Sequence, residues 1–480
     1  MNRLFRSLVE LGLCLAGLLA CLVGAAEGCC AEAQPLPPPN IVWIMADDLG
    51  WGDVACYGAT KVKTPNIDRL AQQGMRFTDA HSETACCTPT RYGVLTGRYS
   101  WRTSLKSGVL SWAAPLLIEE GRLTTPALLK SAGYTTGCVG KWHLGVGRPG
   151  MDWSGELKPG PLEVGFDYAF YMPGSNHGIP ILAENHRLVD PADAGRIKKY
   201  EDAELRLKRQ QEMGPTLAEK AVRFIESNKD KRLFLYFNPV AIHLPYTPAR
   251  QFQGTSNAGV RGDFTQEFDW AVGQVVETID RLGLAEQTLI IVTSDNGGDQ
   301  PGSMGPFRAH KTSVYEGGHR VPFVARWPGK IPAGKVCDET ICLSDLMATC
   351  AALLGKTLPD DAGEDSFNIL PLLLGQKPDG PVRVAMINKA CRGPSISIRQ
   401  GPWKLILPDG CWPTEEGVAA LEAGKLGKGE LYNLAEDIGE SKNLYDQHPE
   451  IVKKLQELFV RIVRQGRSRP PAQPTAQMLP

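Results

Sequence analysis

The sequence predicts an α/β protein in which helices flank a large, mostly parallel sheet. Short apolar runs at residues 40–46 and 288–294 end directly in polar residues, as buried parallel strands often do. Segments with helical patterning lie between such runs. Polar side chains repeatedly follow the ends of these runs. In open α/β sheets, ligands bind at the edge formed by the carboxyl ends of the strands. We therefore expect one functional site at the carboxyl ends of the strands.

The expected strands and helices alternate along most of the chain. Two further apolar runs, residues 134–139 and 233–237, are expected as strands. The helical patterns cover residues 65–74, 124–132, 216–228 and 264–282. This alternation predicts helices that cover a sheet in one large domain.

Domain boundaries follow from length and composition. A chain of 480 residues exceeds one minimal core. We expect a large domain over residues 38–375, because the stretch 375–381 is rich in Gly and Pro. A smaller C-terminal α+β subdomain is expected over residues 381–465, and a disordered tail over residues 466–480. The pieces that predict this subdomain are strand-like residues 394–399 and 403–407 and an amphipathic helix at 449–464.

The N-terminus has the pattern of an export signal. Arg3 and Arg6 precede an apolar stretch that ends in small residues, which predicts a signal peptide over residues 1–26 and a linker over 27–37. The apolar stretch is short for a bilayer span, so we expect no transmembrane span in the mature protein. We expect an exported protein, secreted or periplasmic. Leu18-Leu-Ala-Cys21 also leaves a lipid anchor through Cys21 open.

Charge and cysteine content argue against some classes of function. Lys and Arg total 52 against 53 Asp and Glu, so no net positive field is present to hold nucleic acid. The chain has 13 cysteines, and those beyond the leader repeat no metal-binding spacing such as C-x2-C. Export permits disulfides, but their pairing stays open.

A C-x-P-x-R motif begins at Cys87 and ends at Arg91. Pro89 suits the first turn of a helix, so we expect Cys87 at a helix N-terminus. Such a position attracts anions. An isolated cysteine of this kind is more often a buried structural residue. The motifs elsewhere in the chain favour a chemical role.

Two pairs of oxygen-bearing side chains follow expected strands: Asp47 with Asp48, and Asp295 with Asn296. A single pair of this kind is usually a turn or a helix cap. Two pairs at one sheet edge indicate a metal site. Because the four residues offer only oxygen ligands, the site suits calcium better than zinc.

Four basic residues occupy further motifs in the loops. A lone Lys is usually a solvated surface residue, and a lone His is usually structural. Gathered around one tetrahedral anion, such groups would neutralise its charge and transfer protons. The four residues are Lys141, His143, His243 and Lys311.

With these motifs in this order, residues 39–444 resemble the formylglycine-dependent sulfatases of the arylsulfatase type. The resemblance implies an alkaline-phosphatase-like fold and hydrolysis of sulfate esters on a sulfated carbohydrate or an aryl sulfate. It implies that a formylglycine-generating enzyme converts Cys87 to formylglycine (3-oxoalanine), whose hydrated aldehyde supplies the attacking oxygen. The family more often has Ser where this chain has Thr90, which keeps the hydroxyl.

The same resemblance implies roles for individual residues. Arg91, Lys141 and Lys311 would neutralise sulfate oxygens. His243 or Lys311 would protonate the leaving group, and His143 would handle the hydroxyls of the hydrated aldehyde. The implied calcium ligands are Asp47, Asp48, Asp295, Asn296 and the modified Cys87. The implied substrate contacts are Lys141, His243, Lys311 and, by a looser match, Ser175 with His177.

Two alternative functions stay open at this point. A formylglycine phosphonate or phosphate monoester hydrolase would show a similar set of residues, because fold alone does not determine function. An unmodified, catalytically silent protein that binds sulfated glycans is the second. Specificity is expected from the loops at residues 101–120 and 151–196, where no motif guides the choice of substrate.

Overall fold

The structure is a computed structural model that describes residues 37–178, 180–197 and 202–471. The described residues from 38 onward form one compact unit. The predicted signal peptide and all of the predicted linker except residue 37 lie outside the described residues. Among the residues described, no helix has both the length and the apolar character needed to cross a bilayer.

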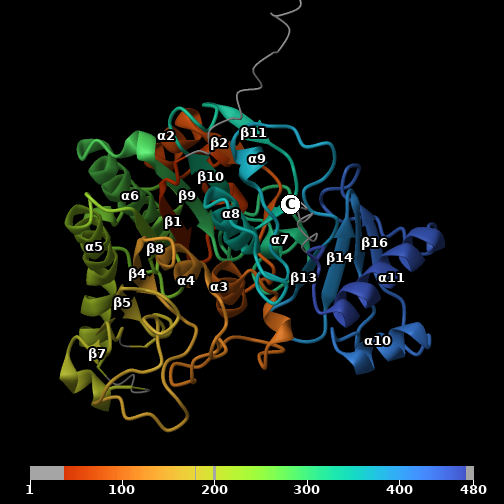
Figure 1. The fold of residues 1–480 in the computed structure, drawn as a ribbon, viewed down its shortest axis with the longest axis horizontal. Helices are drawn as coiled ribbons and strands as arrows, with labels where there is room; N and C mark the ends of the chain where they lie inside the picture. Colours follow the sequence, from red (N-terminus) through yellow and green to blue (C-terminus); the bar gives the residue numbers. More distant parts are fainter. Residues whose placement is uncertain (1–36, 179, 198–201, 472–480) are drawn as a thin grey trace, which may run out of the picture. The chain divides into compact units, whose positions relative to one another are not determined.

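A ten-stranded sheet forms the centre of this unit (Figure 1). In spatial order its strands are β11 (Lys335–Cys337), β2 (Met75–Phe77), β10 (Phe323–Arg326), β9 (Thr288–Ser294), β1 (Asn40–Ala46), β8 (Leu233–Asn238), β4 (Thr135–Lys141), β5 (Tyr168–Met172), β6 (Ala183–Glu184) and β7 (Arg187–Leu188). The middle strands β9, β1, β8, β4 and β5 are parallel, whereas β10, β6 and β7 pair antiparallel with their neighbours. The predicted α/β fold with a mostly parallel sheet is confirmed.

Helices cover both faces of this sheet. Side chains of β1 alternate between two cores: Ile41 and Trp43 face one, and Val42 and Ile44 face the other. The first core also includes side chains of α3 (Cys87–Thr96), α4 (Thr125–Lys130), α8 (Leu346–Leu353) and α9 (Leu370–Leu373). The second includes side chains of α2 (Pro65–Gln73), α5 (Ala203–Ser227) and α6 (Gly259–Arg281). Because both faces are covered, the strand ends and their loops are left to build a site.

Helix α5 is longer than the sequence predicted. The expected helix covered residues 216–228. The structure continues the helix through Pro215 to Ala203, and the Asp202 side chain accepts a hydrogen bond from the backbone of Leu205. A proline within a helix costs one backbone hydrogen bond, and the N-cap at Asp202 supports the added turns.

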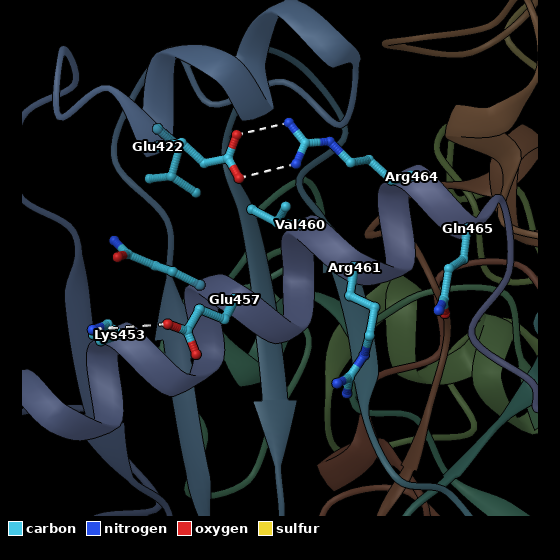
Figure 2. Close-up of a pocket in the computed structure, with 9 residues that line it drawn as sticks. Glu422, Lys453, Glu457, Val460, Arg461, Arg464 and Gln465 are labelled. Carbon is cyan, nitrogen blue, oxygen red and sulfur yellow. Dashed lines mark hydrogen bonds and ion pairs between the residues drawn. The ribbon is translucent and has the colours of Figure 1, made fainter.

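A second, four-stranded antiparallel sheet follows in the chain. Its strands are β13 (Met386–Lys389), β14 (Ile396–Gln400), β15 (Trp403–Ile406) and β16 (Glu430–Asn433), and its helices are α10 (Glu415–Glu422) and α11 (Pro449–Gln465). Arg464 of α11 pairs with Glu422 of α10 at 2.7 Å beside a shallow, charged surface pocket (Figure 2). This α+β part matches the predicted class, while the boundary near residue 375 stays a prediction.

Three short elements lie outside the two large sheets and their covering helices. Strands β3 (Ala80–His81) and β12 (Ile341–Cys342) form a separate parallel pair, and α7 (Glu316–His319) follows a long loop after β9. Residues 467–469, which the sequence placed in the disordered tail, are held against the fold. The backbone of Ser468 donates to the Glu364 carbonyl at 3.1 Å, and Arg469 donates to the Gly363 carbonyl.

Candidate active site

The ends of β1 and β9 bring two oxygen-bearing pairs side by side. These strands are parallel neighbours with Ala46 opposite Ser294, so the residues that follow them meet at the same edge. The side-chain amide of Asn296 donates to Asp48 at 2.7 Å, and the backbone N–H of Asp48 donates to Asp295 at 3.2 Å. All four residues, including Asp47, are buried, with exposed fractions of 1% or less.

Helix α3 presents Cys87 to this edge. The helix begins at Cys87 and is buried along its whole length, and Gly97 ends it in a left-handed conformation at φ +63°. The hydroxyl of Thr90 donates to the carbonyls of Thr84 and Cys86 at 3.0 and 3.2 Å. A hydroxyl at position 90 therefore ties the start of the helix to the segment before it.

The Cys87 thiol meets the carboxylate pair. Its Sγ donates to Oδ1 of Asp47 at 3.6 Å. Burial raises the pKa of the Cys87 thiol to about 12, although the charges of Lys141 and Lys311 act in the opposite direction. An unmodified Cys87 is thus a protonated, weakly nucleophilic thiol at neutral pH.

Arg91 and Lys141 lie beneath this point and are fully buried. Arg91 contacts Oδ2 of Asp295 through Nη2 at 2.6 Å and through Nε at 3.1 Å, and Lys141 Nζ contacts Oδ2 of Asp47 at 2.6 Å. Burial alone would raise the pKa of Asp47, but the charges of Lys141 and Arg91 hold it well below its ordinary value. These two cations stabilise the ionised acids.

Lys311 and His243 approach Asp48 from the opposite side. Lys311 Nζ lies 2.6 Å from Oδ2 of Asp48, and His243 Nε2 lies 3.9 Å from the same oxygen. His243 Nδ1 lies 2.6 Å from the carbonyl of Leu244, so Nδ1 carries the proton and Nε2 faces the site. Burial lowers the pKa of His243 to about 4, so its ring is neutral at neutral pH.

His143 presents an unpaired nitrogen. Its Nε2 lies 3.1 Å from the carbonyl of Leu110 and must donate to it, which leaves Nδ1 without a proton in the neutral ring. Among the described residues, Nδ1 has no hydrogen-bond partner although it is buried. Burial, together with the charges of Lys141 and Arg91, lowers the pKa of His143 well below its ordinary value. Nδ1 is therefore available to accept a hydrogen bond.

A cavity of about 860 Å³ opens onto these groups, a volume within the range of small-molecule sites. Of the residues singled out from the sequence, the ones that line it are Cys87, His143, Ser175, His177, His243 and Lys311. The rings of His177 and His243 are in edge contact at 4.7 Å. Arg91 and Lys141 do not line the cavity, because their side chains are turned to Asp295 and Asp47 below it.

The cavity also has lining residues that the sequence analysis missed. Trp112, from the loop at residues 101–120, packs so closely on Gly174 that a Cβ there would lie 2.4 Å from the indole. Cys391 and Arg392, from the turn between β13 and β14, line the cavity as well. No motif marks these residues. The only signal for Trp112 was its place in a loop expected to set specificity.

The donor set fits a hard divalent cation. Asp47, Asp48, Cys87 and Asp295 each place one ligand atom within 4.8 Å of the others. Oδ1 of the buried Asn296 has no hydrogen-bond partner among the residues described. Three buried carboxylates and an unpaired amide oxygen are ligands that calcium accepts.

Comparisons with known proteins agree with this geometry. The sulfatase family model matches residues 39–356. An N-acetylgalactosamine-6-O-sulfatase of Bacteroides thetaiotaomicron is 36% identical over 89% of this chain and 94% of the relative. Human arylsulfatase A is 38% identical over 70% of this chain and 68% of the relative.

A solved structure has a similar fold. A B. thetaiotaomicron structure, described in the context of the metabolism of multiple glycosaminoglycans, superposes with a TM-score of 0.79. It is 34% identical, and the match covers 89% of this chain and all of that one. The chain belongs to the sulfatase family and is a sulfuric ester hydrolase.

Proposed function

We propose that the protein removes sulfate from a sulfated glycan that contains N-acetylgalactosamine 6-sulfate, with formylglycine made from Cys87 and one calcium ion. The observation that carries this proposal is the meeting of Cys87, which lines the cavity, with the buried acids Asp47, Asp48 and Asp295. Asn296 donates to Asp48 beside them. The choice of glycan rests on the relative that is similar over nearly its whole length.

In this proposal Asp47, Asp48, Asp295 and Asn296 hold the calcium ion. When bound, the ion would supply charge stabilisation and orient a sulfate oxygen against the modified side chain. Arg91 and Lys141 keep two of the ligand carboxylates ionised and in place, through their contacts with Asp295 and Asp47. Their implied role in neutralising sulfate oxygens stays a prediction.

The residues that line the cavity act on substrate and protons. Formylglycine would supply, as its hydrate, the oxygen that attacks sulfur. The unprotonated Nδ1 of His143 accepts a hydrogen bond from a hydroxyl of that hydrate. Lys311, which pairs with Asp48, offers its remaining N–H groups to sulfate oxygens and passes a proton to the departing sugar oxygen. His243, whose Nε2 carries no proton, accepts a hydrogen bond from the substrate.

The test is turnover by protein produced with and without a formylglycine-generating enzyme. We expect release of sulfate from N-acetylgalactosamine 6-sulfate only with the maturation enzyme and calcium present. The mass of the peptide that contains Cys87 should show an aldehyde in the active sample and a thiol in the inactive one. Faster turnover of an aryl phosphonate than of any sulfate ester would favour a phosphonate hydrolase, and binding without turnover by modified protein would contradict the proposal.

A further inference from the structure

Arg392 brings a cation to the cavity that the proposed chemistry does not use. It lies in the turn between β13 and β14, is exposed, and lines the cavity together with Cys87 and Lys311. Its guanidinium makes no hydrogen bond or ion pair with any residue in the described part of the chain. A positive charge is therefore left free at the cavity.

The deeper cations of the site differ from Arg392 in this respect. The basic side chains around Cys87 are each paired with one carboxylate of the proposed metal site. The pairs are Arg91 with Asp295, Lys141 with Asp47 and Lys311 with Asp48, each at 2.6 Å. Arg392 has no such partner among the described residues, and with a net charge of −1 the chain as a whole is not basic.

The turn that carries Arg392 is fixed in place. The backbone N–H of Cys391 donates to the carbonyl of Thr312, next to Lys311, at 3.0 Å, and the N–H of Gly108 donates to the Cys391 carbonyl at 2.6 Å. On the other side of Arg392, the carbonyl of Gly393 accepts from Nζ of the buried Lys389 at 2.9 Å. The backbone of Arg392 is therefore held by contacts on both sides, close to the start of α3.

The start of α3 and this turn are also joined by strand-like pairing. Thr84 and Lys389 form a parallel bridge, and the N–H of Ala85 donates to the Lys389 carbonyl at 2.9 Å. Cys87 and Arg392 thus follow two paired segments, at similar distances from the bridge. The backbone positions of Cys87 and Arg392 are consequently held by the same pair of bonded segments.

We propose that Arg392 is a subsite for a second anionic group of the substrate. The group is a carboxylate or sulfate carried by the sugar ring that adjoins the ring bearing the scissile sulfate. A guanidinium binds either group through two parallel N–H donors, and its exposure allows a chain that extends out of the cavity to reach it. This inference rests on the proposed function, and it narrows the substrate from sulfated glycans to glycans with repeated negative charge.

The test compares two disaccharides that differ in one charge. Both carry N-acetylgalactosamine 6-sulfate linked to a second ring, which is a hexuronate in one and the same sugar with its carboxylate reduced to an alcohol in the other. For the wild-type enzyme we expect a higher kcat/KM on the acidic disaccharide. Arg392→Gln should reduce the ratio of the two kcat/KM values by roughly tenfold, the effect of one charge-assisted hydrogen-bonded contact. Added salt should shrink the wild-type preference, because the contact is exposed.

The matched control is Arg187→Gln, which removes an exposed arginine on β7 that does not line the cavity. This variant should keep the wild-type ratio. A third substrate is the neutral disaccharide with a sulfate added to the second ring. If this sulfate restores the higher kcat/KM of the wild type, Arg392 binds a negative charge of either kind and not a carboxylate alone. An unchanged ratio in Arg392→Gln would overturn the subsite.

Failure of the proposed function is distinguishable from failure of the subsite. If mature wild-type protein hydrolysed none of these disaccharides, the sulfatase substrate proposed above would be wrong. Calorimetric titration with the acidic and the carboxyl-reduced disaccharides would then still decide the role of Arg392. Tighter binding of the acidic compound by the wild type, lost in Arg392→Gln and kept in Arg187→Gln, supports the subsite, and equal binding of both compounds contradicts it.

Discussion

The Sγ atom of Cys87 lies 3.6 Å from Oδ1 of Asp47, although the two residues are 40 positions apart in the chain. Cys87 starts α3, and Asp47 directly follows β1. The contact therefore joins a helix N-terminus to the carboxyl end of a central strand, the two places where elements of an α/β fold bind anions and ligands. A nucleophile at position 87 would begin its reaction in contact with a proposed calcium ligand.

The neighbouring cysteines give a direct test of this position. Cys87→Ala should reduce sulfate-ester turnover to background, because it removes the side chain that we propose becomes the formylglycine nucleophile. Cys86→Ser should keep most of the activity and lose stability at most, since the Cys86 thiol is turned toward the Gly108 carbonyl at 3.9 Å. Turnover and thermal unfolding of both variants provide the measurement. Full activity in Cys87→Ala would refute the assignment.

Removal of metal should stop the reaction reversibly. Chelation leaves three buried carboxylates facing one another without a shared cation, so we expect loss of turnover and recovery when calcium is added. Asn296→Ala removes the buried Oδ1 that has no other partner and should weaken calcium binding by roughly tenfold or more. Calcium dependence of the rate and elemental analysis of the active protein supply the readouts. Zinc at two ions per chain would instead favour a phosphatase-like centre.

The central part of the fold could be predicted because its signals are local. The buried strands β1, β8 and β9 are continuous apolar runs, and the pattern of α6 repeats over many residues. Strand β10 was missed, because it has four residues and pairs antiparallel with partners far away in the sequence. Strands of this kind are determined by tertiary packing and not by periodicity.

Some residues of the site could likewise be predicted from local motifs, and others could not. Asp47, Cys87 and Lys311 lie in motifs whose spacing could be read, and the structure brings them together. The turn with Arg392 could not be placed from the sequence, because its position depends on contacts with segments far away in the chain, such as the bridge between Thr84 and Lys389 and the hydrogen bond from Cys391 to Thr312. The buried placement of Arg91, away from the cavity, also depends on a partner, Asp295, that only the fold supplies.

A pH-dependent change in stability is expected from Glu267. Burial raises the pKa of this carboxyl from its ordinary value to about 8, although the backbone N–H of Ala249 donates to it at 2.6 Å. A folded-state pKa above the unfolded value means that the native state holds a proton that the unfolded chain releases. Stability is therefore greatest below the unfolded value and falls as the pH rises towards about 8.

Glu267→Gln should remove this dependence. The amide is neutral at every pH and can still accept the hydrogen bond from Ala249, so the variant should be more stable than the wild type by about 1 kcal/mol or more at pH 8. Near pH 5 the two proteins should differ little. Urea unfolding at both pH values decides the matter. A variant equally destabilised at both would show that Glu267 is ionised in the native state.

Lys404 helps to attach the small sheet to the rest of the fold. Lys404 on β15 is fully buried between two acids, with Nζ 3.0 Å from Glu316 and 2.8 Å from Glu440. Lys404→Met would leave two buried carboxylates without their shared cation, and a loss of about 3–5 kcal/mol in the free energy of unfolding is expected. Adding Glu440→Gln removes one of these charges while the amide oxygen can still accept from the Glu316 backbone, a contact of 2.7 Å in the wild type. The double variant should therefore be more stable than Lys404→Met, and denaturant unfolding of both measures the difference. If the second substitution instead destabilised the protein further, the network would be held by packing around Lys404 and not by its charge.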